Sequence, residues 1–144
     1  MTRGLEDIAT AEIGETPAAT GGIETRPKVV LTQTSDVRGL RWLRTVDDVA
    51  VVSASSPSVD DLQALLSLVT EEADLEKTIE QAQRTDRLDG TFSITVSAAH
   101  VPYGTSSDIE GAVASAISAR YEWHHTELQR APIDIRVFID GTWA

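Results

Sequence analysis

The second half of the chain contains two stretches of alternating polar and apolar residues with one helical segment between them. Apolar side chains occupy every second position in residues 91–98, and isoleucine and valine repeat the pattern in residues 133–140. Such alternation predicts strands with one buried face. The segment from Ser107 to Tyr121 has apolar residues at helical spacing, and Ser107 and Glu110 have the spacing of a capping box. The order strand, helix, strand predicts a right-handed βαβ unit with parallel strands.

The first half of the chain predicts shorter elements. By their patterns we expect a helix over residues 3–13, a loop over 16–22, and strands over 28–33 and 49–52. Two further helices are expected, one over 58–69 that is capped by Ser58 and one over 71–83. Helices and strands that mix in this way predict an α+β fold. We expect an N-terminal subdomain over residues 1–56 and a second domain over residues 57–144.

The composition restricts the function. The 144 residues carry a formal net charge of −11, and Lys28 and Lys77 are the only lysines. Nucleic-acid affinity rests largely on lysine and arginine, so such a chain is not expected to bind RNA tightly by itself. There is no cysteine, which excludes disulfides and thiol catalysis. Without a long apolar run or a secretory signal, the sequence predicts a cytoplasmic protein.

Three short stretches resemble signatures of the THUMP region of RNA-modifying enzymes. Residues 2–13, with Gly4-Leu5-Glu6 and Glu12, are similar to the opening of the ferredoxin-like part in THUMP-containing guanine methyltransferases. Residues 43–49, which begin Leu-Arg-Thr, resemble the element that ends one helix and begins the next strand in that family. Residues 105–109, Thr-Ser-Ser-Asp-Ile, are similar to the THUMP loop-to-helix junction. The order of the stretches also agrees with the family.

The resemblance implies an α/β-type THUMP domain over residues 57–144 after a ferredoxin-like subdomain over residues 1–56. The strand that precedes the Gly-Leu-Glu helix in the family has no counterpart here, so we expect the ferredoxin-like subdomain to be incomplete. In the family, the two parts together grip the acceptor arm of tRNA, and the THUMP loop engages the single-stranded 3′ end. The resemblance therefore implies a tRNA partner, no cofactor in this chain, and S-adenosylmethionine in a methyltransferase domain beyond residue 144.

The loop and junction between the alternating strand and the helix supply the first candidate RNA contacts. Thr105, Ser106 and Ser107 begin a helix, whose free N–H groups and positive dipole end can hold a phosphate. The alternative is a plain helix cap. Tyr103 in the preceding loop is a candidate for stacking on an unpaired base, or for packing on its own helix. His100 stands near the place where the family usually has arginine or lysine, and we include it among the RNA contacts.

Arginines supply the remaining candidate contacts. Arg120, Arg130 and Arg136 accompany two histidines in the second half, and Arg38, Arg41 and Arg44 recur three apart beside Trp42 in the first. Guanidinium groups bind phosphates with two parallel hydrogen bonds, so Arg41, Arg44, Arg120 and Arg136 are candidates for RNA binding. The alternative for each is an ion pair with one of the many surface carboxylates.

No catalytic constellation stands out in the sequence. Val101-Pro102-Tyr103 resembles the Asn-Pro-Pro-Tyr signature of amino-group methylases only superficially, because Val101 replaces the required polar residue and no glycine-rich nucleotide loop precedes it. His124 and His125 are adjacent and lack the spacing of paired metal ligands on a helix, so we interpret them as a solvated helix end. We expect no metal and no catalytic residue in this chain.

Two functions remain open from the sequence. The first is a non-catalytic tRNA-docking module of a guanine-N2 methyltransferase that recognises the acceptor end weakly in isolation. The second is an acidic, non-catalytic interaction or assembly protein that does not bind RNA, as the net charge and the missing basic loop suggest.

Overall fold

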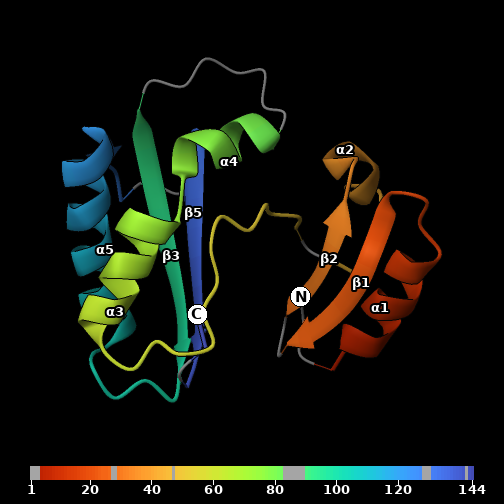
Figure 1. Ribbon diagram of the computed structural model, residues 1–144, viewed down its shortest axis with the longest axis horizontal. Coiled ribbons are helices and arrows are strands. Elements are labelled where there is room, and N and C mark those ends of the chain that lie inside the picture. Colours follow the sequence, from red (N-terminus) through yellow and green to blue (C-terminus); the bar gives the residue numbers. More distant parts are fainter. Residues whose placement is uncertain (1–3, 27–28, 47, 83–89, 128–130, 142) are drawn as a thin grey trace. The chain divides into compact units, whose positions relative to one another are not determined.

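The computed structural model describes residues 4–26, 29–46, 48–82, 90–127, 131–141 and 143–144. Contacts divide the chain into two compact units (Figure 1). The described residues up to Val51, together with Gln81 and Ala82, form the N-terminal unit, and Val52–Glu80 with the described residues from position 90 onward form the C-terminal unit. One sheet is antiparallel and the other is parallel, which confirms the predicted α+β class.

The N-terminal unit is one helix against a two-stranded antiparallel sheet. Helix α1 (Glu6–Gly14) is followed by strands β1 (Ala19–Arg26) and β2 (Val29–Thr34) and by the short helix α2 (Val37–Leu40). The apolar side chains buried here are those of Ala9, Ile13, Ala18 and Leu40. The helix predicted over 3–13 is confirmed from Glu6 onward, whereas Gly4 and Leu5 precede it, and the strand predicted over 28–33 is confirmed from Val29. Arg3 and Lys28 lie outside the described residues.

The loop predicted over residues 16–22 is wrong in its second part, because β1 begins at Ala19. The pairing passes from Ala19 opposite Thr34 to Ile23 opposite Thr32, so β1 carries extra residues in a bulge. A Cβ on Gly21 would lie 2.7 Å from the Cβ of Gln33, so a side chain there would clash. The Thr-Gly-Gly sequence that resembled a loop marks a strand irregularity instead.

The strand predicted over residues 49–52 is also wrong. These residues adopt no regular structure, and the side chain of Val52 is 54% exposed. β-branched residues favour strands through packing against neighbours on a sheet rather than by an intrinsic backbone preference. Within the described residues no strand pairs with this segment, so that packing is missing.

The C-terminal unit is built on a parallel sheet of order β4-β3-β5. The long strand β3 (Thr91–Ala99) pairs with β4 (His124–His125) on one edge and with β5 (Ile133–Asp140) on the other. The register places Phe92 opposite Ile133 and Ala99 opposite Asp140. The predicted strand–helix–strand unit with parallel strands is therefore confirmed.

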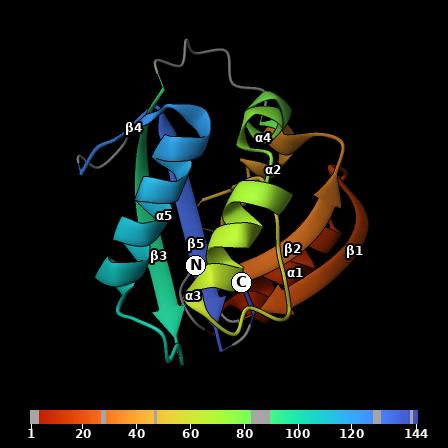
Figure 2. The same ribbon diagram turned by 60° about the vertical axis from the view of Figure 1, so that its left-hand side comes forward.

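Helices cover one face of this sheet. Helix α5 (Ser106–Tyr121) and helix α3 (Leu62–Ser67), which continues as a π-helical turn (Leu68–Glu72), lie on the same side of β3 and β5 in both views, and α4 (Leu75–Gln81) follows (Figures 1 and 2). The most deeply buried large side chains of the core are Val59, Leu65, Phe92, Ile109, Val113 and Ile117.

Three local predictions in this unit need correction. The N-cap of α3 is Asp61, whose Oδ1 accepts from the Ala64 N–H at 2.7 Å; Ser58 lies outside the helix because the next residue, Val59, enters the core. The cap of α5 is Thr105, two residues before the predicted Ser107. His124 and His125 are not a helix end but form β4, because α5 stops at Tyr121 and Glu122 turns the chain in a left-handed conformation with φ of 58°.

Replacement of Ile117 by alanine tests the core. Ile117 is fully buried, so we expect Ile117→Ala to lower the free energy of unfolding of the C-terminal unit by about 2–5 kcal/mol. The control Val52→Ala, at an exposed position of the same unit, should change it by less than about 0.5 kcal/mol. Urea unfolding followed by circular dichroism measures both, and equal losses in the two variants would contradict this account of the core.

Candidate nucleic-acid interface

The carboxyl ends of β3 and β5 meet at one edge of the sheet, because the strands are parallel and in register to their last residues. His100, which follows β3, places its Nδ1 at 2.8 Å from Oδ1 of Asp140, the last residue of β5. The Gly141 N–H donates to the Ala99 carbonyl at 3.0 Å. These contacts tie the start of the 100–105 loop to the end of β5. In open parallel sheets this edge is where ligands bind.

Helix α5 begins at the same edge with a reciprocal capping box. Thr105 Oγ1 accepts from the Asp108 N–H at 3.2 Å, and Asp108 Oδ2 accepts from the Thr105 N–H at 3.0 Å. Donation by the Thr105 backbone, with a smaller part from its hydroxyl, lowers the pKa of the Asp108 carboxyl. Asp108 is therefore ionised at neutral pH, and its negative charge lies in the first turn of the helix.

Ser106 and Ser107 remain available to a ligand. Both residues are exposed, and their backbone N–H groups have no hydrogen-bond acceptor in the described part of the chain. A helix start leaves four N–H groups without partners inside the helix, and the capping box pairs those of Thr105 and Asp108, so the N–H groups of Ser106 and Ser107 stay unpaired. Two amides and two hydroxyls here can donate to an oxyanion or a sugar hydroxyl. The carboxylates of Asp108 and Asp140 at the same edge oppose the approach of a phosphate.

Tyr103 packs inward rather than outward. Its ring lies against the core of the C-terminal unit, and its hydroxyl is buried without a hydrogen-bond partner among the described residues. Burial, and secondarily the charge of Asp61, raises the pKa of this hydroxyl. Of the two hypotheses for Tyr103, this placement supports packing on its own unit, because stacking on a base would require the ring to leave the core.

The candidate arginines of the second half do not join the serines of this edge. Arg120 is at the opposite end of α5, about 22 Å from Thr105 at the helical rise, and its guanidinium lies 5.2 Å from the centre of the Tyr121 ring. Tyr121 in turn stacks on Trp123 at 4.6 Å. Arg130 lies outside the described residues. Arg120 and the serines of the α5 start cannot contact the same nucleotide.

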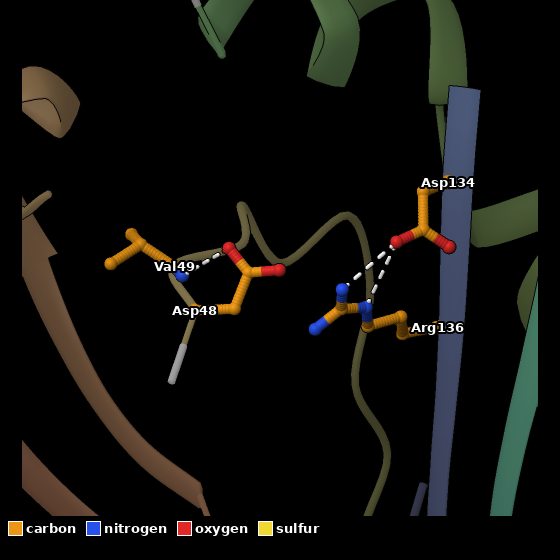
Figure 3. Close-up of polar contacts among 4 residues, drawn as sticks. All are labelled: Asp48, Val49, Asp134 and Arg136. Atoms are coloured by element: carbon orange, nitrogen blue, oxygen red, sulfur yellow. Dashed lines mark hydrogen bonds and ion pairs between the residues drawn. The ribbon is translucent and has the colours of Figure 1, made fainter. Parts of the chain in front are cut away.

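Arg136 lies on β5, on the face of the sheet opposite to Val137. Its Nε and Nη2 donate to Oδ2 of Asp134 at 3.1 and 2.9 Å, a contact that Figure 3 shows together with the hydrogen bond from the Val49 N–H to Asp48. Asp134 and Arg136 are two apart on a strand and so share one face. Of the two hypotheses for Arg136, phosphate binding and an ion pair with a surface carboxylate, the structure contains the ion pair with Asp134.

Arg38, Arg41 and Arg44 belong to the N-terminal unit and are not three positions on one helical face, because α2 ends at Leu40. The backbone after α2 is instead held by α1. Glu12 Oε1 accepts from the Arg44 N–H at 2.8 Å, and its Oε2 accepts from the Thr45 N–H at 2.9 Å. A hydrogen bond from the Thr45 side chain, with these two, lowers the pKa of Glu12.

Glu12 thus joins two of the stretches that carry the THUMP resemblance. It lies near the end of the stretch over residues 2–13, and Arg44 and Thr45 are the Arg-Thr of the Leu-Arg-Thr stretch. Sequence reasoning missed this contact and also the His100–Asp140 pair. Asp140 could have been found, since in-register parallel strands of matched length bring their last residues together. No sequence signal connects Glu12 to Arg44.

Neither a metal site nor a membrane span emerges from these residues. Among the described residues, no group of His, Cys, Asp and Glu side chains is arranged to hold a metal ion. No helix in the described ranges combines the length and the apolar character needed to cross a membrane.

Comparisons of the chain with protein-family models, with curated proteins and with solved structures found no match. The THUMP resemblance therefore stays a prediction that rests on the stretches quoted above.

The Thr105 cap of α5 should contribute measurably to the stability of the protein. We expect Thr105→Ala to lower the free energy of unfolding by about 1 kcal/mol, because the Asp108 N–H loses its acceptor. Ser107→Ala is the control, since that hydroxyl makes no hydrogen bond with a described residue. Urea unfolding compares the two; a control as destabilising as Thr105→Ala would argue against Thr105 as the cap.

The Glu12 contact predicts a dependence on pH. Because folding lowers the pKa of Glu12, the contact is fully formed above the unfolded pKa of about 4.3 and is lost as the pH falls through the lower folded pKa. Hydrogen exchange should show Arg44 and Thr45 amides protected near neutral pH and losing protection on acidification. In Glu12→Gln the protection should be weaker near neutral pH, and the difference from the wild type should shrink as the pH falls through the folded pKa of Glu12. Glu15→Gln, at an exposed position just after α1, should match the wild type.

Proposed function

We propose that the chain is a non-catalytic RNA-docking module that holds the single-stranded acceptor end of tRNA at the carboxyl edge of β3 and β5. The observation that carries the proposal is the position of the exposed Ser106 and Ser107. They stand at the start of α5, beside the end of a parallel sheet, in the stretch that resembles the THUMP loop-to-helix junction. Free amides at a helix start and two hydroxyls suit the phosphates and 2′-hydroxyls of an unpaired RNA end.

The charges near this edge set the expected strength of binding. Asp108 places a carboxylate in the first helical turn with the serines, and Asp140, which is paired with His100, lies at the same edge of the sheet. A phosphate there gains hydrogen bonds but meets negative charge, so the module binds weakly and releases RNA readily as salt rises. Such a module suits a larger enzyme, in which a domain beyond residue 144 binds S-adenosylmethionine and methylates guanine N2 while this chain orients the substrate.

The same carboxylates favour a second candidate function. With a net charge of −11 and two acids at the candidate edge, the chain also suits an interaction or assembly protein that does not bind RNA. The two functions differ in one measurable property, namely whether a tRNA with an intact 3′ end binds better than one without it.

Binding to tRNA with and without its 3′ CCA at low salt tests the proposal. We expect tighter binding of the intact tRNA, and we expect Ser107→Asp to remove this preference because it adds a charge where the phosphate would sit. An acid in the first turn favours the helix, so a loss of binding would not reflect unfolding. Ser115→Asp, at an exposed position further along α5, is the control with the same charge. Equal binding of both tRNAs, or none, would leave the assembly protein as the better candidate.

A further inference from the structure

The most exposed large apolar side chain of the described residues is Trp42 in the N-terminal unit, which is 85% exposed. Indole rings bury large apolar surfaces and are rarely left almost bare to solvent. The proposed 3′-end site at α5 belongs to the other unit and does not use this ring. Trp42 therefore needs an explanation of its own.

The backbone on both sides of Trp42 is fixed. Before it, the side chain of Leu40 is buried, and a Cβ on Gly39 would lie 2.9 Å from the Cβ of Ala18, so α2 is closely seated. After it, the Leu43 N–H donates to the Leu40 carbonyl at 3.2 Å, and Glu12 holds the Arg44 N–H at 2.8 Å. The indole thus projects from a short turn whose two ends are anchored, and not from a free loop.

Three arginines are close neighbours of Trp42 in the chain. Arg38, Arg41 and Arg44 are exposed, and residues 37–46 contain no Asp or Glu. Acids border this segment, since Asp36 precedes it and the carboxylate of Glu12 holds the Arg44 N–H. The side chains of Arg38 and Arg41 form no ion pair within the described residues. This set, Arg38, Arg41, Trp42 and Arg44, is called the Trp42 surface below.

The chemistry of the Trp42 surface distinguishes between two kinds of partner. A protein interface needs on the order of 800 Å² on each side with a desolvated apolar centre. Here the single indole has the exposed Arg41 before it in the chain, and the next residue, Leu43, is only partly exposed. A base needs one flat ring to stack on, and phosphates need guanidinium groups on either side. The surface supplies both, whereas a paired duplex would hide its base faces.

We propose that the Trp42 surface binds an unpaired strand of RNA, with one base stacked on the indole and the adjacent phosphates held by Arg38, Arg41 and Arg44. The choice of RNA over DNA rests on the proposed function, whereas the stacking itself does not. The chain then carries two separate contacts for RNA, one for the 3′ end at α5 and one for a single-stranded stretch at the N-terminal unit.

Fluorescence anisotropy with a labelled oligouridine of about 12 nucleotides, which lacks CCA, tests the surface on the full chain. Stacking of one base accounts for 1–3 kcal/mol by alanine substitution, so Trp42→Ala should weaken binding about tenfold or more. Trp42→Phe should keep much of the affinity because it keeps a flat ring. Lys77→Ala removes an exposed cation outside the surface and should leave binding unchanged. Because Trp42 is exposed, all these variants should fold, which circular dichroism checks.

Salt dependence provides the second readout. Replacing the three arginines by alanine should reduce the slope of log affinity against log salt by about 2, since each single-strand phosphate contact contributes about 0.7. Oligouridine that does not bind at low salt, or that binds Trp42→Ala as well as the wild type, would overturn the proposal. So would a poly-glutamate peptide that competes as well as oligouridine at equal charge, since it has no base to stack.

These outcomes are separate from those of the tRNA experiment. Loss of oligouridine binding in Trp42→Ala with no preference for CCA would retain the Trp42 surface and remove the 3′-end site. If Trp42→Ala keeps the preference for CCA and oligouridine does not bind, the 3′-end site is retained and the Trp42 surface is removed.

Discussion

The in-register pairing of β3 and β5 is the interaction on which the C-terminal unit depends. It sets Phe92 beside Ile133 and Val96 beside Val137, so that the apolar residues of both strands form one face under α5. A slip of one residue would turn Asp134 or Arg136 into that core. Because the strands are parallel, the chain must cross the sheet between them, and α5 makes this crossing while burying Ile109, Val113 and Ile117.

The same pairing decides which groups meet at the candidate site. Both strands end at one edge, where the His100–Asp140 contact fixes the loop and the capping box of Thr105 and Asp108 fixes the start of α5. The capping box uses two of the unpaired groups of the helix start and leaves the amides of Ser106 and Ser107. The groups left at this edge can donate hydrogen bonds, and the carboxylates of the same edge oppose the approach of a phosphate.

In the N-terminal unit, Glu12 has the corresponding role. A helix on a two-stranded sheet buries few side chains, so polar contacts matter more for its order. By accepting the Arg44 and Thr45 N–H groups, Glu12 holds the segment after α2 to α1 across a separation of 32 residues for Arg44. It also orients the turn that presents Trp42. Two stretches that resemble one family in sequence are therefore also in contact in the fold.

Alternation and helical spacing by themselves determined β3, α5 and β5, because a residue that points into a core must be apolar at the period of its element. The sequence also placed the start of α5 within two residues of Thr105. Tertiary structure alone decided the rest. It made a bulged strand of Ala19–Gly22 and left residues 49–52 unpaired, because a strand exists only where a neighbour accepts its hydrogen bonds. In the structure Arg120 and Ser106 lie at opposite ends of α5, and Tyr103 packs against the core. The sequence did not predict either placement, because spacing along the chain does not specify which ends of elements meet in space.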